Sequence, residues 1–239
     1  MKKLFFMALM LSASLSFSQT SSSTIIPDGG GNNASDIQNI NSRSGMWIQS
    51  TKSNNYEGTF YLFENWIYKA EVFDIKGKGY DLPNCNFNVK SNRLEALIEN
   101  DIDDKNGKIF AFNSADLSKF RIGQKLFVKK NTNKGANSMV ELIQQGPKVS
   151  LYKYYNTTIK TTRINPMTQQ KMGRDKIILS PTYFTESEGV MTEVKLKKSA
   201  ILKIMASNKS EVKSFIKENK LNINEDEDVS KVFKYYNSL

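Results

Sequence analysis

The sequence predicts a mainly β protein, in which an antiparallel meander or barrel-like sheet is followed by a C-terminal helical hairpin. Three observations support this fold class. From about residue 46 to 198, short runs rich in aromatic and β-branched residues alternate with turn residues. The connections between these runs are too short for the helical crossovers of a parallel sheet. After residue 198, apolar residues recur every three to four positions, as they do on a helix.

The first eighteen residues have the three parts of a secretory signal peptide. Lysines at positions 2 and 3 precede an apolar run at residues 4–11, and residues 16–18 (SFS) supply small side chains before a cleavage at Gln19. The apolar run is too short for a good membrane span. Residues 19–45 contain mostly Ser, Asn, Gly and Thr, so they bury too little apolar surface to offset the entropy of ordering. They are expected to be a flexible linker.

The predicted antiparallel β domain covers residues 46–198. Its strands are expected at residues 59–63, 66–75, 86–89, 94–103, 108–112, 121–129, 139–145, 149–162, 177–184 and 190–197. The pair Asn106-Gly107 is the strongest hairpin signal, because a type I′ turn requires positive φ at both central residues. A short helical turn is expected from Ser114 to Phe120, capped by Asn113 or Ser114. Residues 163–175 are polar and are expected to form an exposed loop.

Residues 199–239 are expected to form helices that pack on the β domain. In the last segment, four apolar residues have the i, i+3, i+4, i+7 spacing of one helix face: Val229, Val232, Phe233 and Tyr236. Asn208 and Asn224 are the expected N-caps of the two principal helices. Because the linker at residues 221–224 is short, these two helices should form a hairpin. Their apolar stripes require a partner, and the sheet is the simplest one.

The composition excludes several kinds of chemistry. There is no His, which removes Ser-His-Asp and Cys-His catalysis and histidine-ligated zinc. Cys85 is the single cysteine, so no intrachain disulfide or four-cysteine zinc site can form, and it is expected to be a small buried hydrophobic residue. No GxGxxG, P-loop or GxSxG motif is present. No cofactor and no metal are therefore expected.

Acidic residues are the remaining groups for acid–base catalysis near neutral pH. Five of them cluster in the sequence: Glu95, Glu99, Asp101, Asp103 and Asp104. Residues 101–107 also suggest a calcium loop, but Lys and Phe stand at the fifth and twelfth positions, where an EF-hand needs oxygen ligands. A hairpin turn explains the same residues better. Because the neighbours of these acids supply no nucleophile or oxyanion-stabilising group, the protein is expected not to be an enzyme.

The excess of basic residues has several interpretations. Lys and Arg total 34 against 24 Asp and Glu, a net charge of +10 that falls to +8 without the two lysines of residues 1–18. Tyr152, Lys153 and Tyr154 mix aromatic and basic side chains as nucleic-acid platforms do, but they also alternate as in any strand. Exported proteins rarely meet nucleic acid, so none is expected. An envelope protein, or an anionic lipid or polysaccharide surface, is the expected partner, and the chain is not expected to be an integral membrane protein.

Four segments of the sequence are distinctive: the signal peptide ending in SFSQ, Gly58–Trp66 (GTFYLFENW), Asn92–Phe112, and Lys209–Leu239, whose Lys-rich helix pair ending in YYNSL is the most specific part. Together they resemble a group of uncharacterised exported β-rich proteins of Bacteroidota-type Gram-negative bacteria. The resemblance covers most of the chain after residue 18. It implies location in the periplasm or at the outer-membrane periphery, or release from the cell. It implies no catalytic residues.

The function predicted from the sequence is an exported, periplasmic or envelope-associated, non-enzymatic binding or scaffold protein. Five aromatic residues are the candidate binding residues, either as a surface patch or as the lining of a barrel mouth: Tyr61, Phe63, Trp66, Tyr68 and Phe73. The first alternative is a carrier that holds a lipid or small molecule in an aromatic-lined barrel interior. A carboxylate-dependent hydrolase is the lower alternative.

Overall fold

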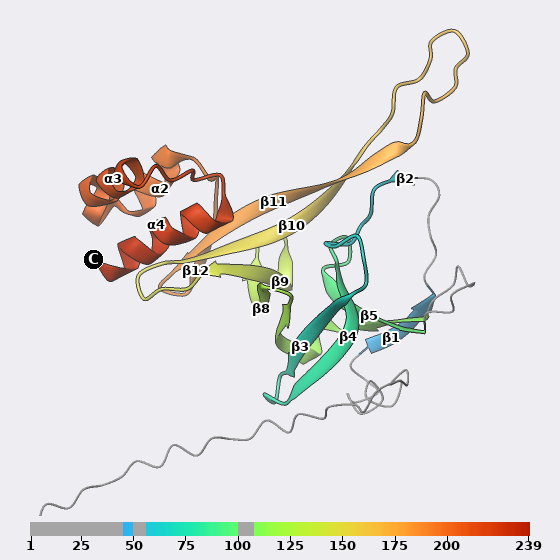
Figure 1. The fold of residues 1–239 in the computed structure, drawn as a ribbon, viewed down its shortest axis with the longest axis horizontal. Helices are drawn as coiled ribbons and strands as arrows, with labels where there is room; N and C mark the ends of the chain where they lie inside the picture. The colour runs from blue at the N-terminus through green and yellow to red at the C-terminus, as the bar shows by residue number, and fades with distance from the viewer. Residues whose placement is uncertain (1–44, 50–55, 100–107) are drawn as a thin grey trace, which may run out of the picture.

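The computed structural model of the chain describes residues 45–49, 56–99 and 108–239. The expected signal peptide, nearly all of the expected linker, the Asn106-Gly107 turn and the calcium-like segment lie outside the described residues. In the described part, one long sheet carries a group of helices near one end (Figure 1). A two-stranded hairpin extends away from the rest of the sheet in the opposite direction (Figure 1).

The strands, in chain order, have the following bounds: β1 Gly45–Gln49, β2 Tyr56–Glu57, β3 Tyr68–Asp74, β4 Gly79–Asn88, β5 Arg93–Glu99, β6 Lys108–Phe112, β7 Leu117–Ile122, β8 Lys125–Thr132, β9 Gly135–Gln144, β10 Ser150–Lys160, β11 Asp175–Ser187 and β12 Val190–Val194. In the sheet they follow the order β1-β6-β5-β4-β3-β7-β8-β9-β10-β11-β12. Neighbours on this path pair antiparallel, and β2 adds a short parallel pairing to β11. The predicted antiparallel meander is confirmed.

The sheet is not closed into a barrel, so that form of the prediction is wrong. The reason lies in β8 and β9, which bury apolar side chains on both faces. Phe127 and Met139 belong to one core cluster, whereas their chain neighbours Val128 and Val140 contact another. Successive strand residues point to opposite faces. The sheet therefore packs on different faces along its width, and its edges β1 and β12 do not meet as they would around a single interior.

Two predicted strands are wrong in detail. Residues 121–129 were expected as one strand, but they contain the end of β7, a turn and the start of β8. Gly123 has a φ of 57°, and Ile122 pairs with Lys125 across the turn. A two-residue hairpin with Gly at its first central position matches the right-handed twist of its strands. Residues 59–63 form no strand apart from an isolated bridge between Tyr61 and Asn88, and the segment instead covers the core from outside β4.

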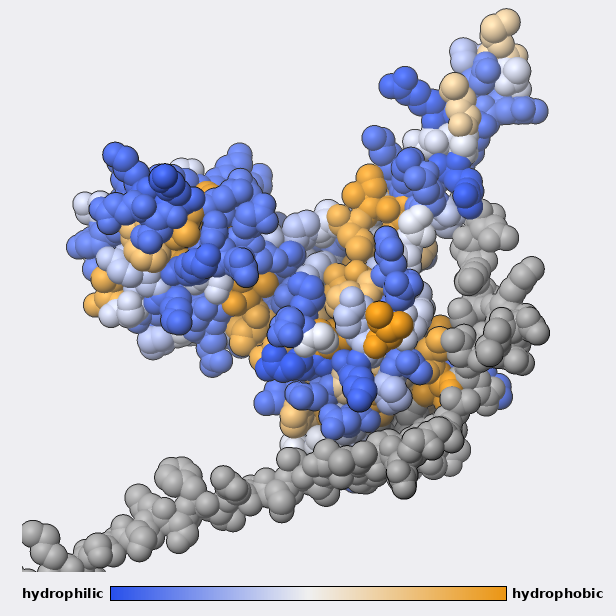
Figure 2. All heavy atoms as spheres, in the orientation of Figure 1, coloured by the Kyte–Doolittle hydropathy of each residue, from blue (hydrophilic) through white to orange (hydrophobic). Residues whose placement is uncertain are grey.

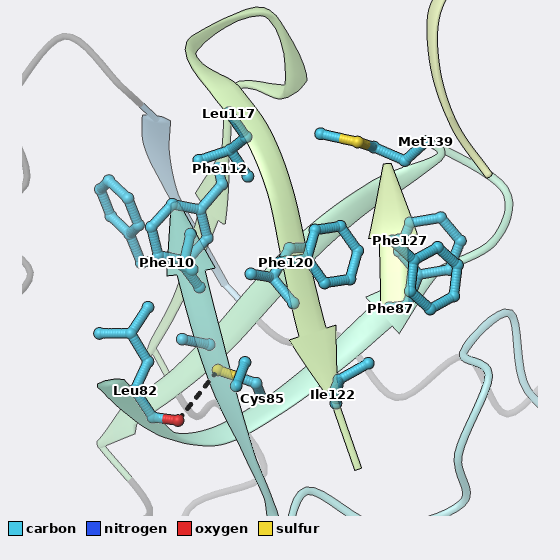
Figure 3. Close-up of a cluster of buried hydrophobic side chains, with 14 of the residues drawn as sticks. Leu82, Cys85, Phe87, Phe110, Phe112, Leu117, Phe120, Ile122, Phe127 and Met139 are labelled. Atoms are coloured by element: carbon cyan, nitrogen blue, oxygen red, sulfur yellow. Dashed lines mark hydrogen bonds between the residues drawn. The ribbon is translucent and has the colours of Figure 1, made fainter. Parts of the chain in front are cut away.

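The main hydrophobic core lies between β3, β4, β5, β6, β7 and the first halves of β8 and β9 (Figure 3). Phe120 and Phe127 stack with ring centroids 4.7 Å apart, and Phe87 lies 4.6 Å from Phe127. Cys85 is fully buried there, with its Sγ atom 3.6 Å from the carbonyl oxygen of Leu82 (Figure 3). Burial raises the pKa of the Cys85 thiol. The predicted buried role of this cysteine is confirmed.

The helices are α2 Lys198–Ile204, α3 Lys209–Glu218 and α4 Asp226–Ser238, with 3-10 turns η1 Ser114–Asp116 and η2 Ala206–Asn208. They form a second apolar cluster with β9, β10 and β12, so the predicted packing of helices on the sheet is observed. Asn208 is the N-cap of α3, as predicted, although its side chain makes no capping hydrogen bond. The prediction for α4 was wrong, because Glu225, rather than Asn224, stands at its N-cap. The helical turn expected at residues 114–120 ends at Asp116, where β7 begins.

The C-terminal end of α4 is fastened to the turn between β9 and β10 by one side chain. Asn237 Oδ1 accepts hydrogen bonds from the backbone N–H groups of Lys148 and Val149, at 2.9 and 3.0 Å. Its Nδ2 donates to the carbonyl oxygens of Val149 and Phe233, both at 2.8 Å. Three of these four hydrogen bonds join the helix to a turn about 90 residues distant in sequence, and the bond to Phe233 lies within α4; the four together are called the Asn237 contact.

Candidate functional site

The five predicted aromatic residues fall into two ring pairs and one separate residue. Tyr61 and Trp66 make an edge-to-face pair with ring centroids 4.8 Å apart. Phe63 and Tyr68 make a second pair, at 4.2 Å, which packs against the main core. Phe73 lies at the other end of β3. Two of the five residues thus extend the core, and the set lines no barrel mouth because the sheet is open.

Phe73 and Tyr61 each have a local partner that accounts for their position. The Lys119 ammonium lies over the Phe73 ring, 4.7 Å from its centroid. The Tyr61 hydroxyl donates a 2.7 Å hydrogen bond to Glu95. Burial, followed by the charge of Glu95, raises the pKa of Tyr61.

Glu95 belongs to the acidic cluster singled out in the sequence, and it is fully buried. Besides Tyr61, its carboxylate accepts hydrogen bonds from Asn88 at 3.0 Å and Arg93 at 2.9 Å. Three donors and complete burial leave no face of this carboxylate for a substrate. A carboxylate-dependent hydrolase needs a second carboxylate at a defined distance from the first. The other four acids of the cluster cannot be placed relative to Glu95, because the Glu99 side chain and residues 101–104 lie outside the described part of the structure.

A polar seam separates the main core from the helix-covered cluster on the same face of the sheet. In its first half, the buried Glu141 of β9 accepts hydrogen bonds from the Tyr155 hydroxyl and from Lys125 Nζ, the latter at 2.9 Å. Burial and the Glu141 charge raise the pKa of Tyr155. This half joins β8, β9 and β10 to one another.

The second half of the seam joins the sheet to helix α4. Asp226, in the first turn of α4, accepts a 2.6 Å hydrogen bond from Lys153 Nζ and a 2.8 Å hydrogen bond from the Tyr183 hydroxyl. Burial and the bond to Asp226 raise the pKa of Tyr183. Lys153 also lies 5.2 Å from the centroid of the Tyr155 ring, which connects the two halves.

Each carboxylate of the seam is matched by one ammonium group and one tyrosine hydroxyl. Fully paired networks of this kind fix the orientation of the elements that contribute to them. The seam therefore holds the helices at a set position on the sheet. Sequence reasoning did not find it, because its residues come from β8, β9, β10, β11 and α4.

A second feature missed by sequence reasoning is the outer end of the β10–β11 hairpin. We call residues 158–178 the arm, and the loop residues 163–172 at its end the tip. The strands pair without interruption from Ser150↔Glu186 to Lys160↔Lys176, and the connecting loop extends past β2 into solvent (Figure 1). The structure therefore carries the loop predicted at residues 163–175 well outside the body of the protein.

The tip exposes apolar side chains at its end. Ile164, Met167 and Met172 are 56%, 92% and 70% exposed. Figure 2 shows moderately hydrophobic atoms at the end of the arm among hydrophilic ones. Single exposed apolar residues are ordinary, whereas a group of them on one projecting loop makes the tip a candidate binding surface.

The tip is an ordered turn. Asn165 donates its N–H to the carbonyl oxygen of Gln170 at 2.8 Å, and its Oδ1 accepts from the N–H of Met167 at 2.9 Å. Met172 donates its N–H to the carbonyl oxygen of Arg163 at 2.9 Å. With these backbone groups satisfied inside the loop, the apolar side chains are held outward before anything binds, which lowers the entropy lost on binding.

The arm also carries basic residues. Residues 160–176 contain one acid, Asp175, and five bases: Lys160, Arg163, Lys171, Arg174 and Lys176. Lys171 pairs with Asp175 and Lys176 pairs with Glu57 on β2, both at 2.8 Å. Among the described residues, the other three bases make no ion pair within 4.0 Å. The interleaving of Ile and Met with Arg and Lys was visible in the sequence, but its position on a projecting hairpin was not.

Two further observations concern metal binding and membrane crossing by the described residues. No group of three or more His, Cys, Asp or Glu side chains within residues 45–49, 56–99 and 108–239 is arranged to hold a metal ion. None of the helices that the structure describes is long and apolar enough to cross a bilayer.

Comparison with known proteins found no matching family, no matching curated protein and no matching solved structure.

Proposed function

We propose that this chain is an exported, envelope-associated binding protein without catalytic activity, and that the arm is its binding element. One observation carries the proposal: an ordered, projecting hairpin exposes three large apolar side chains in a segment that also carries five bases. A soluble surface gains nothing in stability from exposing such a group, so a binding role is its physical explanation. The expected signal peptide supports the exported location.

Hydrogen-bond networks in the body of the molecule hold the inner end of the arm in place. The Glu141 and Asp226 networks join β8, β9, β10, β11 and helix α4. They lie on the inner half of the same hairpin whose outer half is the arm. A rigid base fixes the direction in which the tip points, which is a requirement for specific docking.

The two alternative functions have less geometric support. The carrier needs an enclosed apolar space, but the sheet is open and two of the proposed lining aromatics, Phe63 and Tyr68, pack against the core. The hollow between α3 and α4 is open to solvent, with Phe215 and Tyr235 stacked in it at 4.1 Å. The hydrolase needs accessible carboxylates, but Glu95 is enclosed by its hydrogen-bond donors.

The test is cosedimentation of the purified protein with washed Gram-negative envelope membranes. A tip variant replaces the three exposed apolar residues by serine: Ile164→Ser, Met167→Ser and Met172→Ser. We expect the wild-type protein to sediment with the membranes and the tip variant to stay in the supernatant.

A matched control replaces three comparably exposed apolar residues elsewhere on the surface: Ile67→Ser, Ile75→Ser and Val190→Ser. This variant should sediment like the wild type. Both variants should keep the circular dichroism spectrum and unfolding midpoint of the wild type, because none of the six side chains is buried. If the tip variant sediments as well as the wild type, the arm is not the binding element.

A further inference from the structure

We propose that the tip docks on an anionic lipid bilayer, with its apolar residues in the interface and its bases against the headgroups. This inference rests on the proposed function of the arm as the binding element, and it identifies the chemical nature of the partner. The observations that carry it are the arrangement of apolar and basic residues along the arm, the shape of the tip and its size.

The apex of the arm is apolar, and apolar and basic residues lie side by side behind it. Met167 lies at the turn, flanked by Pro166 and Thr168, and is the most exposed of the large apolar residues described. Ile164 and Lys171 form the bridge immediately behind it. Met167 therefore stands ahead of every base of the arm, whereas Met172 lies level with Arg163, to whose carbonyl oxygen it donates its N–H. The long side chains of Lys and Arg can reach headgroups while neighbouring apolar side chains enter the interface.

The charges of the arm are complementary to an anionic surface. Lys160 and Lys176 lie directly opposite each other across the hairpin, so both point to the same face. Lys176 is paired with Glu57, so Lys160 contributes the charge of this pair that no acid among the described residues balances. Arg163 and Arg174 are exposed between this pair and the apex. A base near an anionic membrane surface adds about fivefold to the binding constant. Guanidinium groups also bind phosphate oxygens through paired hydrogen bonds.

The shape and size of the tip favour a bilayer over a folded protein as the occupant. A stable protein interface takes about 800 Å² from each partner, contributed by about 20 to 30 residues. The tip has residues 163–172, and its apolar group stands on the convex end of a two-stranded hairpin (Figures 1 and 2). A protein partner would need a deep complementary pocket, whereas a fluid interface adapts to a convex loop.

The first measurement is flotation of the purified protein with vesicles of phosphatidylcholine, with or without phosphatidylglycerol. We expect binding to vesicles that contain phosphatidylglycerol, and weaker binding as the salt concentration rises. Each of the three tip substitutions should weaken binding on the order of tenfold, because each removes a large apolar side chain from the interface. The control variant at positions 67, 75 and 190 should float like the wild type.

The contribution of the basic residues to binding is tested by two double variants that remove the same amount of charge. Arg163→Gln with Arg174→Gln removes two bases of the arm and should weaken binding on the order of twentyfold. Lys213→Gln with Lys217→Gln removes two exposed bases of helix α3, with the same change in net charge. This second pair should leave binding within about twofold of the wild type, because these lysines are remote from the arm.

A site-specific probe reports insertion directly. Met167→Cys introduces an exposed thiol, and an environment-sensitive fluorophore will react with it in preference to the fully buried Cys85. We expect the emission to shift to the blue with phosphatidylglycerol vesicles. A probe at Lys213→Cys should not shift.

The results separate this inference from the proposed function. If the protein sediments with envelope membranes through its tip but does not float with phosphatidylglycerol vesicles, the arm is still the binding element and the lipid inference is wrong. Equal binding to vesicles with and without phosphatidylglycerol, or no shift at position 167, would also overturn the inference. Tip-independent sedimentation with envelope membranes would overturn the proposed function.

Discussion

The hydrogen bonds of Asn237 lead to a prediction about Gly146, which lies in the turn beneath it. A Cβ atom built on Gly146 would lie 2.1 Å from both Cγ and Nδ2 of Asn237, far inside van der Waals contact. Gly146→Ala therefore cannot coexist with the Asn237 contact. We expect the asparagine side chain to be displaced and its four hydrogen bonds to be lost.

The magnitude follows from the groups that lose their partners. Val149 is buried, so its N–H and carbonyl groups have no water to replace Asn237, whereas Lys148 is exposed and can be hydrated. An unsatisfied buried backbone group costs about 1–3 kcal/mol. We therefore expect Asn237→Ala to lower the free energy of unfolding by about 2–4 kcal/mol. Gly146→Ala should cost nearly as much, reduced by up to about 1 kcal/mol because alanine restricts the unfolded chain.

The assay is urea unfolding of the two single variants and the double variant, followed by circular dichroism. In the Asn237→Ala background the space above Gly146 is empty, so Gly146→Ala should be neutral or stabilising there. The two changes should thus be strongly non-additive, with a coupling free energy of about 2–4 kcal/mol. If Gly146→Ala costs the same in both backgrounds, the clash with Asn237 is not the cause and the reasoning fails.

Three further predictions concern the core and the polar seam. Phe127→Ala should lower the free energy of unfolding by about 3–5 kcal/mol in a urea titration, because it leaves a cavity among stacked rings. Asp226→Asn should cost about 1–2 kcal/mol and raise hydrogen exchange within α4, whereas exchange in β4 should not change. Tyr155 and Tyr183 have raised folded-state pKa values, so their stabilisation is complete below pH 10 and is lost as the pH rises above it. Tyr155→Phe should make alkaline unfolding less steep, and an unchanged slope would contradict this.

The meander and the helical C-terminus were predictable because they are local patterns. Alternation of apolar residues, Gly-containing turns and the i, i+3, i+4 stripe of α4 each act within a few residues. Val229, Val232, Phe233 and Tyr236 were predicted as one helix face and are all buried. The strand predictions failed where a run of apolar or aromatic residues did not correspond to a single strand. The apolar run around Gly123 continues through a turn, and the aromatic run from Thr59 to Phe63 covers a core rather than pairing in a sheet.

The candidate site was harder to predict because its properties depend on position in space. The aromatic residues chosen from the sequence were the most apolar in their region, and for that reason Phe63 and Tyr68 became part of the core packing. The residues that remained exposed, Ile164, Met167 and Met172, stand in a segment whose average composition is polar. Composition averages over the loop, whereas binding depends on which side chains the hairpin carries away from the body.

By itself, the sequence determined the class of fold and the absence of histidine chemistry and of an intrachain disulfide, since composition and short-range periodicity suffice for these. The expected burial of Cys85 was confirmed by the tertiary structure. The tertiary structure decided that the sheet stays open, because β8 and β9 bury side chains on both faces. It also decided which polar groups pair, since Glu141 and Asp226 find partners on other strands. Contacts between residues far apart in the chain are set by topology and register, which no local pattern encodes.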